Sequence, residues 1–469
     1  MKALIDVNPT AEQLALFSRT SPGVEVIRGA AGSGKTTTAL LKLRSAVAFY
    51  LNRTKRLAVP KPVNVLVLTY NRTLRGYITE LTQKQLHEEP LIHIEIATFN
   101  SWARRLVPPH KEILNIKASS DHLLGCAGGL KMDLRFAADE AAYVIGRFLP
   151  ENINEYLGVR RDGRGITPRM EKPARQLLLD HVIGRYNEYK QKHNLVDWND
   201  LAVRLANETI CEYDVIVVDE TQDFSANEIR AVLNQRSKDA TTTFVLDGAQ
   251  RIYSRNFIWS EVGVTLRPEK SSTLQTNYRN TKQIANFAST LLDGLTMGDD
   301  GTMPNSNSAT SEGEKPTVLM GSYPSQARYA RQYIQKNVDL TKESVAFLHP
   351  KGWFSGLRPE LDRHGLKWVS LTGESEWPEG PENIALCTLH SCKGLEFDHI
   401  IMLGLDGSVV DVDTPDDDNE DYEPSSRLRR LIAMGVGRAR KNVILGFKKT
   451  DAPDIIRYFN EELYHGVDV

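Results

Sequence analysis

A glycine-rich stretch near the start of the chain has the residue types and spacing that hold phosphate groups. It follows the apolar run 23–28, precedes a helix-compatible run 37–49, and reads Gly29-Ala30-Ala31-Gly32-Ser33-Gly34-Lys35-Thr36. In such a loop, backbone N–H groups and a helix N-terminus cradle phosphates, the lysine reaches the β- and γ-phosphates, and the threonine hydroxyl binds Mg²⁺. The pattern predicts a P-loop that binds a nucleoside triphosphate, with Thr37 in the same turn.

Two adjacent carboxylates follow a second apolar run. Residues 215–218 are Val-Ile-Val-Val, and Asp219 and Glu220 come directly after them. Asp219 suits a Mg²⁺ ligand, and Glu220 is placed to polarise an attacking water; solvated acids at a strand end are the other interpretation. A glutamate beside the aspartate favours hydrolysis over transfer to a small molecule, since a kinase would have to exclude water from the γ-phosphate.

These side chains need strands that bring them to one edge of a sheet. Apolar runs predict strands at 23–28, 63–69, 92–98, 213–219, 242–247, 344–349, 383–389 and 399–405. They alternate with helical patterns, which is typical of parallel α/β sheets, and ligands gather beyond the carboxyl ends of such strands. Between 108 and 195 the pattern becomes helical, as in residues 173–192. Residues 297–316 and the acidic run 411–423 are predicted surface loops.

The composition excludes some classes of protein. The 469 residues include 58 basic and 60 acidic side chains, and the net charge of −2 excludes a general polycation for nucleic acid or anionic lipid. This length predicts roughly two to four domain cores. Because no apolar stretch approaches the ~18 residues of a membrane span and no signal peptide is recognisable, we expect a cytoplasmic protein without membrane contact.

The cysteines give no sign of a special site. Cys126, Cys211, Cys387 and Cys392 include no C-x-x-C pair. They are too few and too scattered for a disulfide framework. We expect buried thiols in a reducing compartment rather than metal ligands.

At Asp219-Glu220-Thr221-Gln222-Asp223-Phe224 the chain resembles the D-E-x-Q-D motif of superfamily 1 helicases of the UvrD/Rep type. Eight further stretches resemble the other motifs in the family's order. They are 8–13 (Q motif), 68–72 (Ia), 98–103 (Ib), 197–201 (the acidic-aromatic segment), 247–253 (III), 277–279 (IV), 388–397 (V) and 429–439 (VI). One short match is weak, but nine in order are hard to explain otherwise.

The resemblance implies that ATP and Mg²⁺ bind between two domains that close on the γ-phosphate. Arg279 and Arg438 match the family's two γ-phosphate arginines, which join Lys35 and Glu220 as catalytic residues. The family analogy also gives roles to Gln13 (reading the adenine edge), Tyr278 (stacking on the base), Gln250 (sensing the γ-phosphate) and Glu396 (holding the ribose).

A strand of nucleic acid needs aromatic platforms for bases and polar or cationic groups for phosphates. By resemblance the aromatic candidates are Tyr70, Phe99, Trp102 and Tyr253, each of which can also be read as a core residue. Arg255 stands where relatives carry a base-stacking tryptophan. The backbone contacts implied are Thr69, Asn71, Arg72, Thr98, Thr388 and His390. Residues 160–192 carry a net charge of +5, which indicates either a duplex-facing patch or a solvated helix face.

The predicted fold class is α/β, with two RecA-like P-loop domains built from parallel sheets flanked by helices. Domain 1A is assigned to residues 1–107 and 196–265, a helical 1B-like insertion to 108–195, and domain 2A to 266–469. Relatives insert a 2B domain before motif V. Here only about a dozen residues, 372–382, fill that gap, so we expect no 2B domain.

The function implied is an ATP- and Mg²⁺-dependent translocase or helicase of superfamily 1A on single-stranded DNA, or RNA. A 3′ to 5′ polarity follows from the resemblance only. The alternative is a regulatory ATPase in which strand binding activates a partner, such as a nuclease in an anti-phage defence system. A nucleic-acid binding module with a dead ATPase is disfavoured because Lys35, Thr36, Asp219, Glu220, Arg279 and Arg438 are all present.

Overall fold

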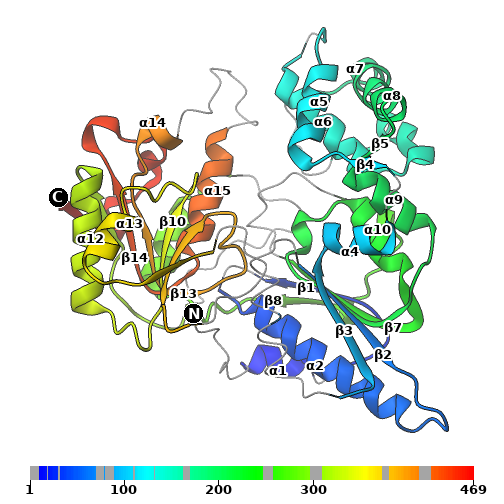
Figure 1. Ribbon diagram of the computed structural model, residues 1–469, viewed down its shortest axis with the longest axis horizontal. Helices are drawn as coiled ribbons and strands as arrows, with labels where there is room; N and C mark the ends of the chain where they lie inside the picture. Colours follow the sequence, from blue (N-terminus) through cyan, green and yellow to red (C-terminus); the bar gives the residue numbers. More distant parts are fainter. Residues whose placement is uncertain are drawn as a thin grey trace.

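The computed structural model consists of two α/β bodies and a helical insertion that rises from the first body (Figure 1). It describes residues 10–17, 20–29, 32–69, 79, 89–108, 111–130, 132–161, 169–246, 257–295, 309–371, 380–410 and 424–469. The chain builds most of the first body, leaves it for the insertion, returns to complete it, and then forms the second body.

Six parallel strands of the described chain form the first sheet, in the spatial order β3-β2-β6-β7-β1-β8. Their bounds are β1 Gly23–Gly29, β2 Val63–Thr69, β3 Ile92–Thr98, β6 Tyr213–Val218, β7 Arg236–Leu246 and β8 Ser271–Leu274. The helices of this body are α1 Ala11–Phe17, α2 Lys35–Thr54, α4 Phe99–Leu106, α9 Trp198–Asn207 and α10 Ala226–Asn234, with short 3₁₀ turns at Thr221–Asp223, Trp259–Val262 and Pro268–Lys270. All carboxyl ends therefore meet at one edge.

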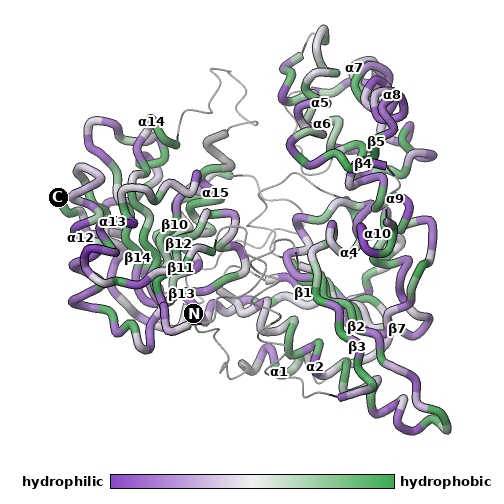
Figure 2. The backbone as a smooth tube through the Cα atoms, in the orientation of Figure 1, coloured by the Kyte–Doolittle hydropathy of each residue, from purple (hydrophilic) through white to green (hydrophobic). Residues whose placement is uncertain are grey.

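Alternate residues of the central strands pack on opposite faces of the first sheet. Val65 and Val67 of β2 belong to the buried cluster that contains Leu43 of α2. Leu66 and Leu68 belong to the cluster formed with α4, α9 and α10. Because side chains alternate along a strand, an unbroken apolar run indicates a sheet covered on both sides. Figure 2 shows these strands as hydrophobic.

The segment predicted as a helical insertion is helical. Its elements are β4 Glu112–Ile113, α5 Ile116–Cys126, α6 Leu134–Arg147, a 3₁₀ helix Pro150–Leu157, α7 Lys172–Leu177, a π-helical stretch Leu178–Ile183, α8 Gly184–Lys192 and β5 Leu195–Val196. The strands β4 and β5 pair in parallel where the chain enters and leaves. The insertion has its own buried core, which includes Phe136, Tyr156 and Tyr186.

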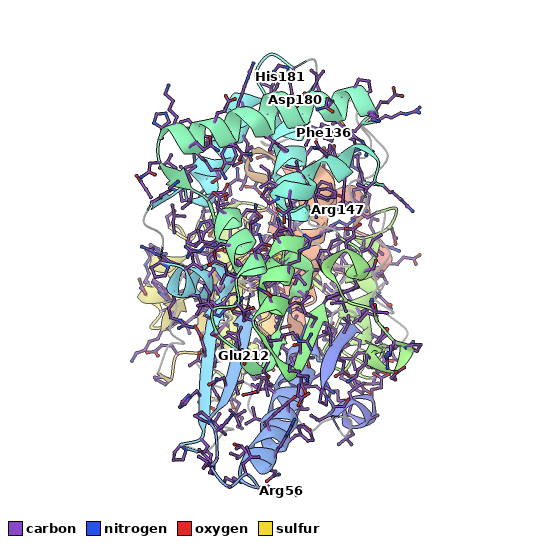
Figure 3. All side chains as sticks on the ribbon, turned by 90° about the vertical axis from the view of Figure 1, so that its right-hand side faces the viewer. Arg56, Phe136, Arg147, Asp180, His181 and Glu212 are labelled. Carbon is purple, nitrogen blue, oxygen red and sulfur yellow. The ribbon has the colours of Figure 1, made fainter. Side chains whose placement is uncertain are left out.

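Arg147, at the end of α6, fixes the insertion to the first body (Figure 3). Its guanidinium forms two hydrogen bonds with the carboxylate of Glu261, at 3.0 and 2.6 Å, and lies over the ring of Phe148. Asn227 of α10 donates to the carbonyls of Ile145 and Phe148 at 2.9 and 3.0 Å. Buried polar contacts on two elements therefore hold the base of the insertion in one orientation.

The described part of the second body contains a sheet of seven parallel strands, in the order β11-β12-β10-β13-β14-β9-β15. The strands are β9 Thr317–Met320, β10 Val345–His349, β11 Trp368–Ser370, β12 Ile384–Thr388, β13 Phe397–Met402, β14 Ala439–Phe447 and β15 His465–Asp468. The helices are α11 Lys282–Thr290, α12 Tyr323–Asn337, α13 Arg358–Arg363, α14 Gly407–Val410 and α15 Pro424–Val436, with 3₁₀ turns at Lys449–Asp451, Asp454–Tyr458 and Glu461–Leu463. The α/β class with parallel sheets is confirmed.

The predicted boundary between the two bodies, at residues 265 and 266, is wrong. Strand β8 pairs in parallel with β1 of the first sheet, from Val26 opposite Ser271 to Gly29 opposite Leu274. The first body therefore continues to Leu274. The strand was not predicted because Ser-Ser-Thr-Leu has too little apolar character to stand out. Most of the gap assigned to the missing 2B domain, 372–379, lies outside the described residues, so its absence stays a prediction.

Two expectations drawn from composition can be compared with the structure. Among the helices that the structure describes, none combines the length and the apolar character needed to cross a membrane. All four cysteines are free thiols: Cys387 and Cys392 are buried as expected, whereas Cys126 and Cys211 are partly exposed.

Candidate active site

The P-loop lies between the end of β1 and the start of α2, as the sequence predicts. Gly32 and Gly34 have φ angles of 80° and 75°, a region that residues with a side chain rarely adopt. A Cβ on Gly32 would also lie 2.0 Å from the Asn277 Oδ1 atom. Helix α2 begins at Lys35, so its N-terminus and that ammonium face the same loop. Ala30 and Ala31 lie outside the described residues.

Gln13 of α1 contacts the P-loop through its side-chain amide. Its side-chain Nε2 donates to the Gly34 carbonyl at 3.2 Å, and its Oε1 accepts the backbone N–H of Thr10 at 2.9 Å. The residue is only 2% exposed. The structure thus assigns Gln13 to holding the loop, while its predicted contact with adenine stays a prediction.

Asp219 and Thr36 lie together at the carboxyl edge of the first sheet. The Thr36 hydroxyl donates to Asp219 Oδ2 at 2.9 Å, and Asp219 Oδ1 accepts the backbone N–H of Glu220 at 2.9 Å. Carboxylate and hydroxyl oxygens are the ligands that Mg²⁺ takes in P-loop proteins, where it also binds substrate phosphates. The donor set therefore fits the predicted Mg²⁺ ligands.

Glu220 is held in a strained position among cations from the second body. Its φ of 54° places a non-glycine residue in the left-handed region. One carboxylate oxygen accepts from Gln222 Nε2 at 2.5 Å and lies 3.5 Å from Lys393 Nζ; the other lies 3.9 Å from the Arg438 guanidinium. Lys393 also pairs with Asp223. Two sheets thus contribute charges to one buried cluster.

The pKa values of the two adjacent carboxylates shift in opposite directions. Burial, with the neighbouring Glu220 charge, raises the pKa of Asp219 to about 6. Burial acts in the same direction on Glu220, but Lys393, Arg438 and Lys35 together outweigh it and lower its pKa. Glu220 is therefore ionised at neutral pH, as a group that accepts a hydrogen bond from water must be.

The segment 277–280 joins the P-loop to the second body. Backbone N–H groups of Tyr278 and Arg279 donate to the Gly32 carbonyl at 3.1 and 3.3 Å. The Asn280 amide donates to the carbonyl of Gly437 at 3.0 Å and to that of Ala439 at 2.6 Å. The P-loop is thus connected within a few residues to the strand that follows Arg438.

Arg279 and Glu396, predicted to contact different parts of a nucleotide, form an ion pair with each other. The Arg279 guanidinium also donates to the Gly437 carbonyl at 3.4 Å. Burial alone would raise the pKa of Glu396, but Arg279 lowers it. The tyrosine between the two bodies, Tyr278, is 41% exposed and open to a ligand. Gln250 lies outside the described residues.

A family model places this geometry among known proteins. The model of the UvrD/REP helicase N-terminal domain matches residues 10–257, just over half of the chain. The chain belongs to the UvrD/Rep helicase family. The match covers the P-loop, Asp219 and Glu220, and the whole helical insertion.

Curated UvrD/Rep relatives are similar over parts of their length. A probable DNA helicase II homologue of Mycoplasma pneumoniae is 24% identical over 299 residues, covering 58% of this chain and 40% of the relative. The ATP-dependent DNA helicase Rep of Escherichia coli is 40% identical over 84 residues, 18% of this chain and 11% of Rep. The ATP-dependent DNA helicase UvrD2 of Mycobacterium bovis is 29% identical over 97 residues, 20% of this chain and 14% of UvrD2. Each match spans less than half of the relative.

Three of the residues assigned to nucleic acid by UvrD/Rep resemblance are buried, so that part of the prediction is wrong. Phe99 is 4% exposed and Trp102 is fully buried, and both pack in the core beneath the first sheet. The Trp102 indole N–H donates to the Tyr213 hydroxyl at 3.0 Å. Thr69 is also fully buried. The aromatic pair fills space between α4 and the sheet instead of facing solvent.

Of the other residues predicted to contact nucleic acid, some are described by the structure and some are not. Thr98 caps α4, accepting the backbone N–H of Ser101 at 3.4 Å, and Thr388 accepts the N–H of Ser391 at 3.1 Å. Thr98, Thr388 and His390 are partly exposed at the carboxyl edges of their sheets, where a ligand can reach them. Tyr70, Asn71, Arg72, Tyr253 and Arg255 lie outside the described residues.

A cavity of about 590 Å³ opens where the insertion joins α4. It is lined by Arg104, Pro108, Lys111, Glu112, Ile113, Asn115 and Trp198. Two cations beside a tryptophan are the groups that bind phosphates and stack on bases. The sequence quoted Trp198 only as part of the acidic-aromatic segment, and the lysine and arginine stand in no motif, so this site was not predicted.

Proposed function

We propose that this chain is an ATP-driven motor that moves along single-stranded DNA, with helicase activity where the strand enters a duplex. One observation carries the proposal. The carboxylate of Glu220 in the first body contacts Lys393 and Arg438 of the second. The charges needed for ATP hydrolysis therefore come from two bodies that share one site.

The residues divide the chemistry among them. Backbone N–H groups of the P-loop and the Lys35 ammonium hold the phosphates, and ionised Glu220 orients water and accepts its proton. Mg²⁺, when bound at Thr36 and Asp219, supplies positive charge that offsets the charge of the phosphates. Arg438 and Arg279 stabilise the negative charge that develops on the γ-phosphoryl group.

Coupling to movement follows from where the arginines lie. Both belong to the segments that the second body contributes, at residues 279 and 438. Hydrolysis is fast only when these segments are in place, so each turnover requires the two bodies to be correctly placed. A strand bound to both bodies is then displaced when their relative position changes.

Single-stranded DNA is supported as the substrate by three observations. The curated relatives are DNA helicases, the carboxyl edge of the second sheet exposes Thr388 and His390, and the cavity below the insertion carries Arg104, Lys111 and Trp198. The 3′ to 5′ polarity of the proposal rests on the family resemblance. Competition of single-stranded RNA with single-stranded DNA for binding tests whether RNA is also a substrate.

Steady-state ATPase activity with and without single-stranded DNA tests the proposal, followed by unwinding of 3′-tailed and 5′-tailed duplexes. We expect strand-stimulated ATPase and a preference for the 3′ tail. Strand binding without any ATP hydrolysis would refute the motor. ATPase that stays silent until a nuclease or other partner protein is added would instead support the regulatory ATPase.

A further inference from the structure

The loop that follows β10 presents a large aromatic side chain to solvent. Trp353 is 55% exposed, whereas its neighbour Phe354 is 5% exposed and belongs to the core of the second body. Trp353 stands in none of the motifs that the sequence offered. A tryptophan left this exposed beside a buried phenylalanine contributes little to packing and has its ring free for a ligand.

The loop is built to hold this ring in place. The His349 Nδ1 atom accepts the backbone N–H groups of Lys351 at 3.1 Å and Trp353 at 3.2 Å, and the His349 carbonyl accepts from Gly352 at 3.3 Å. Gly352 has a φ of 69°, which favours glycine. The indole stacks on the imidazole with centroids 5.8 Å apart and an interplanar angle of 22°.

The imidazole beneath the tryptophan is neutral. His349 is 3% exposed, and burial lowers its pKa to about 4. A neutral ring keeps an unprotonated nitrogen, so it can accept both backbone N–H groups at physiological pH. These hydrogen bonds are therefore retained at neutral pH, and a loop held in this way loses less conformational entropy when the tryptophan binds a ligand.

A cation lies over the ring, and a candidate contact for the strand lies beside the loop. The Lys351 ammonium is 5.4 Å from the Trp353 ring centroid. A Cβ on Gly352 would lie 3.1 Å from the Thr388 methyl carbon, and the backbone N–H of Leu389 donates to the His349 carbonyl at 3.4 Å. The loop and the end of β12 thus form one surface at the carboxyl edge of the second sheet.

We propose that Trp353 is a platform on which one base of a single-stranded nucleic acid stacks, with Lys351 at an adjacent phosphate. A ring that is 55% exposed and held beside a lysine suits every base, since each has an aromatic face. The assignment deepens the proposed function and rests on it, because it adds a second-body contact that no motif assigns.

The test compares two probes of the same length, an oligothymidylate and an abasic oligonucleotide that keeps the phosphates. Trp353→Ala should weaken oligothymidylate binding about 5- to 100-fold and leave abasic binding nearly unchanged, because only the first probe can stack. Trp353→Phe should retain most of the affinity. Lys351→Gln should weaken both probes and reduce the salt dependence by about 0.7 per decade, the value for one phosphate.

Trp368→Phe is the matched control. This tryptophan also lies under a cation in the second sheet, but its indole N–H is bonded to Asp362 at 2.9 Å. We expect Trp368→Phe to change neither the affinity for oligothymidylate nor the quenching of tryptophan fluorescence when oligothymidylate binds. Trp353→Phe, in contrast, should remove that quenching. If Trp353→Ala weakens binding of both probes equally, or of neither, Trp353 is not a base-stacking platform. Either result would leave the proposed motor function untouched. A wild-type protein that binds neither probe would refute both.

Discussion

Glu220 combines three features in one side chain: a strained backbone, burial and contact with cations of the other body. A left-handed non-glycine residue costs about 1 to 3 kcal/mol, and the rest of the structure must offset this cost. In this position the carboxylate lies close to Lys393 and Arg438. We infer that this position is maintained for chemistry, since the left-handed backbone conformation alone would favour glycine here.

Two substitutions separate binding from chemistry at the P-loop edge. Lys35→Ala and Glu220→Gln should both abolish ATP turnover, but only the first should weaken ATP binding, because the ammonium contacts the phosphates. Glu220→Gln keeps the shape and loses the ability to orient water. Steady-state ATPase and equilibrium binding of a fluorescent ATP analogue measure both effects. Wild-type turnover by Glu220→Gln would show that another group activates the water.

Individual residues were predictable where a motif fixes them. The P-loop with Thr36 follows β1, and Asp219 and Glu220 follow β6, so the parallel sheet brings them to one edge; Arg438 reaches Glu220 from the start of β14 in the second body. Phe99 and Trp102 were misassigned because residue type cannot distinguish a core aromatic from a base platform. Lys393 was quoted in motif V without a role, since its partner Glu220 is distant in sequence.

The loop after β10 has a protonation state on which its structure depends. The pKa of His349 falls from 6.5 to about 4 on folding because the ring is buried. Between these pH values the unfolded chain binds the proton more tightly, so the contribution to stability is complete above pH 6.5 and decreases as the pH falls toward 4. The loss is on the order of 3 kcal/mol.

His349→Gln should remove this pH dependence, because a glutamine oxygen can accept the same N–H groups without titrating. Urea unfolding between pH 4 and pH 7 gives the free energy of unfolding of the wild type and of the variant. The difference between the two at each pH removes the contribution of the other titrating groups. We expect the wild type to lose more stability than the variant on acidification. Parallel curves would mean that the ring is protonated in the folded protein without penalty.

The base of the insertion depends on one buried arginine. Arg147→Met would leave the carboxylate of Glu261 without its bidentate partner and remove the hydrogen bond to the Arg160 carbonyl. Losing the charged hydrogen bonds of this guanidinium costs about 1.5 to 3 kcal/mol, and the effect should appear as faster amide exchange in α6. Arg185→Met, an exposed arginine on α8, is the control. Unchanged exchange in α6 would contradict this anchoring role.

Long apolar strands were predictable and short polar strands were not. Residues 63–69 and 92–98 match β2 and β3 residue for residue, because β2 is a nearly continuous apolar run buried on both faces and β3 has isoleucine at every second position. Strands β8, β9 and β15 have four residues each and were not predicted. Their position depends on a neighbouring strand that supplies the hydrogen bonds, and sequence periodicity contains no information about that neighbour.

At the scale of the whole molecule, the two arginines test whether the bodies act together. Arg279→Ala and Arg438→Ala should each lower turnover by about 10³-fold or more while changing ATP affinity much less, because their charge is used mainly as the γ-phosphoryl group departs. Lys448→Ala, an exposed cation of the second body, is the control. Losses in affinity with normal turnover would count against a shared site.

The strand pair β4–β5, through which the insertion is joined to the first body, determines how the insertion can be replaced. The insertion enters at Glu112–Ile113 and leaves at Leu195–Val196, and these strands are paired neighbours, about 5 Å apart. Because the two strands are parallel, whatever replaces the residues between them must cross back from the end of β4 to the start of β5, which a tight turn cannot do, and must replace the contacts of Arg147 and Asn227. The insertion thus joins the first body at one strand pair, and we expect an exchange of its helices to leave the P-loop and Glu220 in place.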